Sequence, residues 1–507
     1  MKKITFVKNS KNFSIEFIEG QNLLEIIREH DFDIDATCGG RGTCGKCTVE
    51  INEKMVKSCT TTAIDGMIVK FSDISEINNI LTETEKLDIK VKPIFSTIVE
   101  GYGLAVDIGT TTIAAYLYDI HTGERLMVKS SINPQKIFGA DVISRIDYTR
   151  KGEVERLKMH TEIVECIQMI IDDLPYPLSI LMFTGNTTMM HFLLDLDASG
   201  IAVAPFTPES TDLHMLKAKE IGFNKNAANA TMVVLPCVSA YVGADTVSAV
   251  IATGLDTAEK PELLVDIGTN GEIALKTPDG IWACSTAAGP AFEGANITFG
   301  MPAVEGAISK AWIENDQLRF KTIGDCEPKG LCGSGVLDLI ALMLETEVVD
   351  CTGRLVDDDE LSQDWLKKRI VEYNNANAFK IVGDILVTQK DVREIQNAKA
   401  AICAGITILA TRAGVELTDI FATHLAGGFG NFMDRKSAVK IGLIPCELEA
   451  SCKTSGNAAG LGASMALLNQ DNLNQVISLS KTIKYIELSY DPDFVNSYVD
   501  NMMFGDE

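Results

Sequence analysis

The strongest constraint on the fold is a motif that the chain contains twice. "LAVDIGTTTIAAYLYD" begins at Leu104 and "LLVDIGTNGEIALK" begins at Leu263, so Asp107 and Asp266 lie 159 positions apart. In each copy an apolar run leads into the letters DIGT and a second apolar run follows, which predicts two strands joined by a tight turn. Solenoid repeats have periods of about 20 to 50 residues. The much longer period here therefore predicts two similar halves of one larger domain.

Predicted strands and helices alternate from residue 104 onward, as is typical of an α/β fold. At 507 residues the chain is too long for one ordinary core. We therefore expect an N-terminal domain at 1–75, a linker at 76–100, and the two halves of the duplicated domain at 101–258 and 259–507, the second with a C-terminal extension. The N-terminal domain alternates β-rich runs with one helical run, "NLLEIIREH", which predicts a small sheet packed on a helix.

Each turn of the repeated motif offers the groups that a phosphate site needs. Backbone N–H groups and hydroxyls can bind phosphate oxygens, and an Asp beside the turn can hold Mg²⁺ directly or through water. One such turn is a weak signal, but two in corresponding places predict a nucleotide site between the halves. The predicted residues are Asp107 and Asp266 as catalytic groups, with Gly109, Thr110, Thr111, Gly268, Thr269 and Asn270 at the phosphates.

A third motif, "HLAGGFGNF", ends an apolar run in three glycines. Gly427, Gly428 and Gly430 leave room for a flat base or a ribose, which a Cβ would block, so we predict an adenosine site here. Asp141 in "FGADV" and Glu272 in "NGEI" are carboxylates beside glycine turns. We include both as catalytic candidates that orient Mg²⁺ or the attacking water.

Three further residues near these motifs are interpreted as structural. His191 and His424 lie in apolar surroundings, where a histidine is more often a satisfied core residue than a catalytic one. Cys332 is interpreted as a small buried side chain, because cysteine commonly packs in this way.

The stretch "TCGGRGTCGKC" in the N-terminal domain indicates a second kind of chemistry. Cys38, Cys44, Cys47 and Cys59 are spaced C-x5-C-x2-C-x11-C. A 2Fe-2S cluster takes four thiolates, and the plant-type spacing is one residue shorter in its first gap. Zinc also takes four cysteines, but its sites normally use two C-x2-4-C pairs and only one such pair exists here. The spacing therefore favours the cluster over a structural zinc.

Charge and hydropathy exclude several classes of partner. The net charge of −25 argues against nucleic acid, because phosphate binding needs clustered Lys and Arg. The most apolar stretch, "AAICAGITILAT", has twelve residues, whereas a membrane-spanning helix needs about 20. No secretory signal is recognised at the N-terminus, so we expect a cytoplasmic protein without a membrane partner.

Two resemblances follow from these motifs. The cysteine motif is similar to that of β-grasp ferredoxins. The two hairpins and the adenosine motif together resemble the superfamily of acetate and sugar kinases, heat-shock-70 proteins and actin. That resemblance implies a duplicated RNase H-like ATPase domain, in which "GADTVSAVIATG" and "NAAGLGASMALL" are the two connecting helices of the hinge. The expected fold class is thus multidomain α/β, with a ferredoxin-like domain followed by this ATPase domain.

A closer resemblance rests on "INPQKIFGADVISRI", "FTGNTTMMHFLL", "AAGPAFEGANI" and "GLCGSGVLDLIA" together with the cysteine motif. This combination resembles the reductive activators of corrinoid proteins, in a short variant, since a linker of 25 residues leaves no room for the extra domain of longer members. The resemblance implies ATP-dependent, one-electron reduction of Co(II) to Co(I) through the 2Fe-2S cluster, in a methyltransferase system.

The implied cofactors are the cluster, ATP and Mg²⁺. The implied partners are a corrinoid protein and an upstream ferredoxin or flavin reductase, and a homodimer is compatible with the sequence. Two alternatives stay open at this point: a redox-sensing ATP-binding switch, and a small-molecule kinase of the same superfamily. The sequence names neither the corrinoid protein nor the physiological electron donor.

Overall fold

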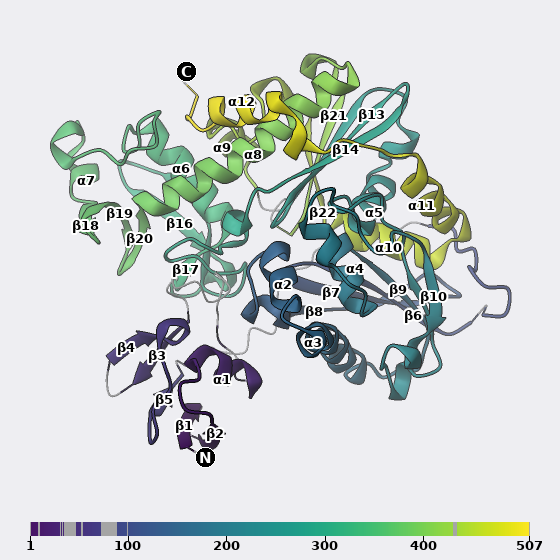
Figure 1. The fold of residues 1–507 in the computed structure, drawn as a ribbon. Helices are drawn as coiled ribbons and strands as arrows, with labels where there is room; N and C mark the ends of the chain where they lie inside the picture. The colour runs from purple at the N-terminus through teal and green to yellow at the C-terminus, as the bar shows by residue number, and fades with distance from the viewer. Residues whose placement is uncertain are drawn as a thin grey trace.

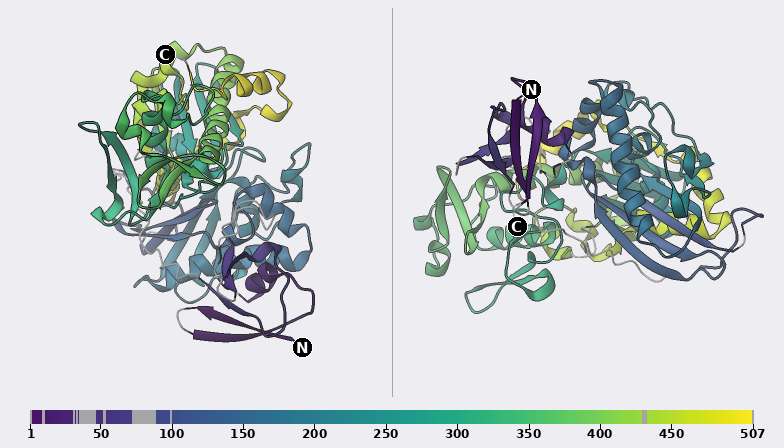
Figure 2. Two further views of the ribbon diagram at one scale, coloured as in Figure 1. Left: turned by 90° about the vertical axis from the view of Figure 1, so that its left-hand side faces the viewer. Right: turned by 90° about the horizontal axis from the view of Figure 1, so that it is seen from below.

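The computed structural model describes residues 2–8, 11–30, 32, 34, 47–51, 54–71, 89–98, 100–428 and 433–505. Its ribbon shows a small N-terminal domain beside a larger body made of two sheet-and-helix lobes (Figure 1). Two further views show that the N-terminal domain packs on the outside of this body (Figure 2). None of the helices in these ranges is both long enough and apolar enough to cross a membrane.

The described part of the N-terminal domain is a mixed sheet that packs on one helix. Its elements are β1 (Lys2–Lys8), β2 (Lys11–Phe17), α1 (Leu23–Glu29), β3 (Thr48–Ile51), β4 (Lys54–Lys57) and β5 (Ile68–Lys70). The strand order is β2-β1-β5-β3-β4, with β1 antiparallel to β2 and parallel to β5. Leu24 and Ile27 of α1 are buried in one core with Phe6 and Val69 of the sheet. This is the small sheet on a helix that the N-terminal sequence predicts.

The first lobe is built on a sheet of order β10-β11-β9-β6-β7-β8. Its strands are β6 (Tyr102–Ile108), β7 (Thr112–Asp119), β8 (Arg125–Ile132), β9 (Leu178–Gly185), β10 (His214–Lys217) and β11 (Thr231–Val234). Its helices are α2 (Val142–Thr149), α3 (Glu153–Asp172), α4 (Thr187–Leu193) and α5 (Ala244–Thr253). β6, β7 and β8 form an antiparallel meander, and β9 and β11 continue the sheet parallel to β6.

The second lobe repeats five strands of this topology, with sheet order β22-β21-β12-β13-β14-β23, and its sixth strand lies at the opposite edge. Its strands are β12 (Glu262–Ile267), β13 (Gly271–Thr277), β14 (Gly280–Thr286), β21 (Ala422–Ala426), β22 (Cys452–Gly456) and β23 (Lys484–Tyr485). β12, β13 and β14 form the antiparallel meander, and β21 and β22 run parallel to β12. The duplication predicted from the two DIGT motifs is therefore present in the structure, with one motif at the first turn of each meander.

Additional elements lie between β14 and β21. They are β15 (Ala307–Ile313), β16 (Leu318–Thr322), β17 (Gly330–Leu331), α6 (Gly333–Glu345), α7 (Asp364–Lys367), β18 (Ile370–Tyr373), β19 (Ala376–Val382), β20 (Ile385–Thr388) and α8 (Gln389–Ala413). α9 (Arg435–Lys440) follows β21. Two small sheets, of order β16-β15-β17 and β18-β19-β20, extend the second lobe on the side away from β14 (Figure 1).

Two helices join the lobes. α5 belongs to the first lobe but contacts β12 and β13, whereas α10 (Ala458–Leu468) follows β22 and contacts β6 and β9. The two helices also pack against each other. Their crossing is so close that a Cβ on Gly462 would lie 2.0 Å from the carbonyl oxygen of Ser248. These are the two helices that the superfamily resemblance implies for the hinge.

The C-terminal extension contributes to both lobes. Leu473 and Val476 of α11 (Gln470–Thr482) are buried in the core of the first lobe. α12 (Pro492–Asp500) then packs on α8 of the second lobe, where Arg412 Nη2 lies 2.8 Å from the carboxylate of Asp491. The end of the chain therefore holds the two lobes together.

The described end of the expected linker is attached to the first lobe. The backbone N–H of Lys92 donates to Leu468, and the N–H of Gln470 donates back to Lys92. Lys92 Nζ also lies 2.6 Å from a carboxylate oxygen of Asp471. Residues 89–92 thus belong to the junction of α10 and α11, while 76–88 of the expected linker lie outside the described residues.

Candidate active site

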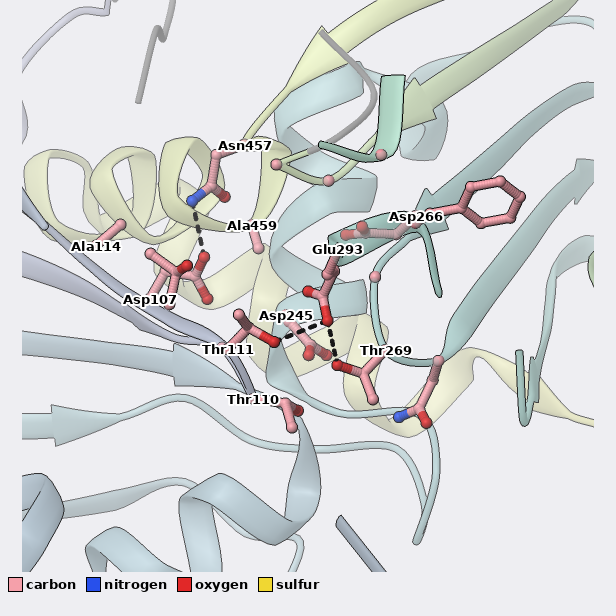
Figure 3. A pocket seen from close by; sticks show the side chains of 18 of the residues that line it. Asp107, Thr110, Thr111, Ala114, Asp245, Asp266, Thr269, Glu293, Asn457 and Ala459 are labelled. Carbon is pink, nitrogen blue, oxygen red and sulfur yellow. Dashed lines mark hydrogen bonds between the residues drawn. The ribbon is translucent and has the colours of Figure 1, made fainter. Parts of the chain in front are cut away.

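The two repeated hairpins face each other across one cleft between the lobes (Figure 3). The cavity volume of the cleft is about 190 Å³. This is less than the roughly 300–1,000 Å³ that is typical of small-molecule sites, so a whole nucleotide would need the lobes to move apart or would extend out of the cavity. Its lining includes Asp107, Gly109, Thr110, Thr111, Asn186, Asp245, Asp266, Gly268, Thr269, Asn270, Glu272, Phe292, Glu293, Cys332, Ser334, Gly427, Gly428 and Asn457.

The two glycines of the hairpins have different roles. The N–H of Gly109 donates to Thr112 at 3.0 Å, and a Cβ on Gly109 would lie 2.6 Å from that same carbonyl oxygen. The N–H of Gly268 donates to Asn270 at 3.0 Å, but a Cβ there would meet nothing closer than 3.8 Å. The first turn therefore needs glycine to close, whereas the second has space for a ligand beside its glycine.

One carboxylate joins the two hairpins. Glu293 Oε2 accepts a hydrogen bond from Thr111 Oγ1 at 2.8 Å and another from Thr269 Oγ1 at 2.6 Å (Figure 3). Thr111 belongs to the first lobe and Thr269 to the second, so a single side chain spans the cleft. Burial raises the pKa of Glu293, and the hydroxyl hydrogen bonds oppose that shift.

Three half-buried aspartates surround this bridge. Burial raises the pKa of Asp107 to about 7, against a hydrogen bond of 2.8 Å from Asn457 Nδ2. Burial, together with the nearby carboxylates, raises the pKa of Asp266 to about 8. Burial also raises the pKa of Asp245 to about 6. Each of these carboxyl groups would therefore ionise more readily beside a cation.

The lining of the cleft is rich in carboxylates. It holds the carboxylates of Asp107, Asp245, Asp266, Glu272 and Glu293, and no Lys or Arg lines it among the described residues. A triphosphate alone would be repelled here, whereas a cation-bound one would not. No group of three His, Cys or acidic side chains in the described ranges could hold an ion by itself.

A buried arginine supports the first hairpin from behind. Arg145 of α2 is 1% exposed, and its Nη2 donates to the carbonyl of Thr110 at 2.6 Å. Its Nε donates to the carbonyl of Gly139 at 2.9 Å. From the same side, Asn133 Nδ2 donates to the carbonyl of Gly109 at 2.9 Å. The backbone carbonyls of Gly109 and Thr110 are thus held in place from the side of α2 and Asn133.

The glycine motif lies beside the second hairpin. Gly427 has φ +97°, and a Cβ there would lie 2.5 Å from the carbonyl oxygen of Ile267. Gly428 lines the cleft with nothing within 4 Å of its Cβ position, as an adenosine site requires. Gly430 lies outside the described residues.

The remaining candidates are placed as follows. Glu272 lines the cleft, and burial raises its pKa well above its ordinary value. Asp141 does not line the cleft: it caps the N-terminus of α2, where its carboxylate accepts from the backbone N–H and the hydroxyl of Ser144 at 2.8 and 2.9 Å. The catalytic role expected for Asp141 stays a prediction without support from this geometry.

The residues interpreted as structural all make internal hydrogen bonds. His191 Nδ1 lies 2.7 Å from the carbonyl of Thr187, and its Nε2 accepts from the backbone N–H of Glu209. His424 Nε2 lies 2.9 Å from Glu262. Cys332 lines the cleft, but its thiol donates to a backbone carbonyl and burial raises its pKa.

Sequence reasoning did not identify several polar residues of this site, among them Asp245, Glu293, Asn457 and Arg145. Each lies inside a motif that the sequence analysis used for its resemblance or its hinge helices. A polar side chain in an otherwise apolar, glycine-rich stretch is the sequence signal that could have identified them as site residues.

Two of the four expected cluster ligands lie in the described residues. Cys47 Sγ and Cys59 Sγ are 3.2 Å apart, brought together by a backbone hydrogen bond from Ser58 to Cys47. Two buried donors next to them, Arg28 Nε and Ser58 Oγ, have no hydrogen-bond acceptor among the described residues. Two thiols close together, next to hydrogen-bond donors that have no described acceptor, are suited to hold an iron–sulfur cluster. Cys38 and Cys44 lie outside the described residues.

Family models match three consecutive stretches of the chain. They are the 2Fe-2S iron-sulfur cluster binding domain over residues 6–69, the RACo middle region over residues 102–258, and the C-terminal domain of RACo, the ASKHA domain, over residues 260–507. These matches confirm the predicted combination of a ferredoxin-like domain with an ATPase-type domain.

Similar proteins cover nearly the whole chain. It is 33% identical over 562 residues to the corrinoid activation enzyme RamQ of Eubacterium limosum, which covers 93% of this chain and 94% of the relative. It is 25% identical over 435 residues to the Co(II) methylated amine-specific corrinoid protein reductase of Methanosarcina barkeri, with 78% and 76% covered. A solved structure, a reductive activator for corrinoid, iron-sulfur protein, matches with TM-score 0.75 and 26% identity over 99% of this chain and 98% of that one.

Proposed function

Because the chain belongs to the family of reductive activators of corrinoid proteins, we propose that it reduces the Co(II) of an inactive corrinoid protein to Co(I) with the help of ATP. The observation that carries this proposal is the joint presence of converging cluster cysteines and a two-lobed nucleotide cleft in one chain. A kinase would need the cleft alone, and an electron carrier would need the cysteines alone.

The cluster ligands we propose are Cys38, Cys44, Cys47 and Cys59. A bound 2Fe-2S cluster would supply a one-electron carrier with a potential near about −400 mV. Ser58 and Arg28 would hold hydrogen-bond donors beside it, since both keep a buried donor without a described acceptor. Donors of this kind stabilise added negative charge on cluster sulfur.

The nucleotide residues we propose keep their predicted roles. Asp107 and Asp266 would hold Mg²⁺ directly or through water, and Glu272 would orient water. The phosphates would lie between the hairpins, next to Thr111 and Thr269, and the adenosine next to Gly428. Support comes from the lining of the cleft, where both hairpins and the glycine motif meet.

ATP is needed because reducing Co(II) is unfavourable for a donor at ferredoxin potential. For one electron, each 59 mV of unfavourable difference lowers the equilibrium constant about tenfold. ATP offsets such a difference only if it binds two conformations with different affinity. The structure shows the lobes held together by the Glu293 bridge. The hinge helices would allow a second conformation with the lobes apart.

Further expectations belong to the same proposal. We expect an upstream ferredoxin or flavin reductase as electron donor, a corrinoid protein of a methyltransferase system as partner, and a cytoplasmic location. A homodimer stays an expectation as well.

The test is anaerobic reduction of candidate corrinoid proteins. Reduced full-length protein, Mg-ATP and a Co(II) corrinoid protein should give the absorption spectrum of Co(I). Cys59→Ser should abolish the reaction through loss of cluster iron, and Asp266→Ala should abolish its ATP dependence while the cluster spectrum is kept. Cys446→Ser, at an exposed cysteine, is the matched control and should behave as the wild type. Equal Co(I) formation with and without ATP would contradict the proposal.

A further inference from the structure

A buried arginine of the N-terminal domain contacts the ATPase domain. Arg28 of α1 is 7% exposed, and its Nη2 donates to the backbone carbonyl of Ile137. Its guanidinium carbon also lies 5.6 Å from the centre of the Phe138 ring, within the range of a cation–π interaction. Phe138 in turn packs on Tyr148, with ring centres 4.5 Å apart.

The charge of the same arginine interacts most strongly with Tyr148 and Glu25, and also with the cluster cysteines. Its charge interacts electrostatically with Cys47 and with Cys59, and its Nε is a buried donor without a described acceptor. Arg28 therefore donates a hydrogen bond to the ATPase domain, while its positive charge interacts with two of the proposed cluster ligands. Reduction of the cluster adds one negative charge at that place, which strengthens the attraction of the guanidinium.

The residues that Arg28 contacts lead directly to the first phosphate hairpin. Ile137 and Phe138 lie in the segment 133–139, called here the relay segment. At its start, Asn133 holds Gly109 and Thr111 of the hairpin through hydrogen bonds of 2.9 and 2.8 Å. At its end, Gly139 accepts from Arg145, which also holds Thr110.

The relay segment thus lies between two buried arginines. Arg28 of the N-terminal domain donates to Ile137 of this segment, and Arg145, which also holds the phosphate hairpin, donates to Gly139. Gln135 is 0% exposed, and its Nε2 donates to the carbonyl of Met159 in α3 at 2.8 Å. Because the segment is packed and hydrogen-bonded on both sides, a shift of the hairpin displaces Ile137 and Phe138 as well.

We propose that Arg28 is a positioning residue that couples the charge of the cluster to nucleotide binding, through the relay segment and the first phosphate hairpin. This inference rests on the proposed 2Fe-2S cluster and on the proposed nucleotide site, and it adds a connection between them. If nucleotide binding draws the hairpin and the relay segment toward the phosphates, the guanidinium moves away from the cysteines, and the sign of the coupling holds for that direction of movement.

The sign of the coupling follows from electrostatics. Less positive charge at the cluster makes the reduced form less stable, so nucleotide binding lowers the reduction potential. Because coupling between two sites is reciprocal, nucleotide must then bind more weakly to the reduced protein, by the same factor. This is the direction that an uphill electron transfer to Co(II) needs.

The experiment measures both sides of this coupling in the full-length protein. The midpoint potential of the cluster is titrated with and without Mg²⁺ and the non-hydrolysable analogue AMPPNP, after cluster loading is checked by visible absorbance. The dissociation constant of AMPPNP is measured for the air-oxidised and the dithionite-reduced protein. We expect a ratio of dissociation constants between about 5 and 150, the usual size of allosteric coupling. A ratio of ten corresponds to a potential lowered by about 59 mV.

Three variants assign the coupling to Arg28. Arg28→Met keeps the aliphatic bulk and removes the charge, so it should lower the potential without nucleotide and bring the ratio to about one. Arg28→Lys keeps the charge but loses the planar contact with Phe138, and should retain part of the ratio. Lys54→Met removes an exposed charge from the same domain and should leave the ratio unchanged.

Several results would overturn the inference. They are a wild-type ratio of one in protein that is loaded with cluster and binds AMPPNP, a potential raised by nucleotide, and an unchanged ratio in Arg28→Met. Failure of the proposed function gives a different result, namely no ATP-dependent formation of Co(I). A protein that forms Co(I) with ATP but shows no coupling contradicts only the role of Arg28.

Discussion

At the scale of single residues, the cleft is a cluster of carboxylates whose ionisation is suppressed. Burial raises the pKa of Asp107 to about 7 and that of Asp266 to about 8. These pKa values lie above those of the same groups in the unfolded chain, so the folded protein binds protons more tightly. The resulting contribution to the free energy of unfolding is complete below about pH 4 and is lost as the pH rises through about 7 to 8. We expect the thermal midpoint of the ligand-free protein to fall over this interval, and Mg-ATP to remove most of that fall.

Measuring the protons released on ligand binding is an independent check of this predicted pH dependence. Mg²⁺-nucleotide favours ionised carboxylates, so binding at about pH 6.5 should release protons, which calorimetry in two buffers of different ionisation enthalpy detects. Asp266→Asn should release fewer protons. Binding without proton release at this pH would show that the carboxyl groups are already ionised in the ligand-free cleft.

A second residue-scale prediction concerns the bridge across the cleft. Glu293→Ala removes hydrogen bonds to Thr111 and Thr269. A typical intramolecular hydrogen bond contributes about 0.5–1.5 kcal/mol. The lobes should therefore separate more readily, with faster amide hydrogen exchange in both hairpins and ATP turnover reduced at least about tenfold. Glu305→Ala, at an exposed residue outside the lining, is the matched control. Unchanged exchange and turnover in Glu293→Ala would mean that the bridge does not hold the lobes.

At the scale of elements, the crossing of α5 and α10 determines the geometry of the cleft. Asp245 lies in the first turn of α5, and Asn457 caps the N-terminus of α10, so both depend on how the two helices pack. Gly462→Ala would place a Cβ 2.0 Å from the Ser248 carbonyl oxygen and force the helices apart. We expect a loss of about 1–3 kcal/mol in the free energy of unfolding, with weaker nucleotide binding.

Gly505→Ala is the matched control for the helix crossing, because nothing lies within 4 Å of its Cβ position. Chemical denaturation and nucleotide titration of the two variants should therefore differ. Equal stability of both variants would mean that the helices adjust to the methyl group without separating.

At the scale of the whole molecule, the cluster domain and the ATPase domain are connected both by the chain and by the Arg28 contact. A protease site between residues 80 and 81, in the expected linker, allows the chain to be cut after purification. Cutting should lower Co(I) formation, because it removes the high effective concentration that a tether supplies, and excess cluster domain should restore part of it. The uncut protein with the same insertion is the control. Full activity of the cut protein at nanomolar concentration would show that the Arg28 contact suffices without a tether.

The sequence by itself determined the parts of this protein whose chemistry is local. A hairpin that binds phosphate needs Gly and Thr at the turn, and a cluster needs cysteines at short spacing, so both are visible in a few consecutive letters. The duplication was equally visible, because Asp107 and Asp266 begin the same pattern in each half. The β-grasp domain and the two ATPase lobes followed from these motifs and from the resemblance they carry.

Only the tertiary structure decided which side chains meet. Glu293 touches Thr111, which is 182 positions away, and Asn457 touches Asp107, which is 350 positions away. Asp141 has the right residue type for the cleft but caps α2 instead, because a local backbone N–H competes for its carboxylate. Arg28 reaches Ile137 across two domains. Contacts of this kind depend on how the domains pack, which no pattern of neighbouring residues encodes.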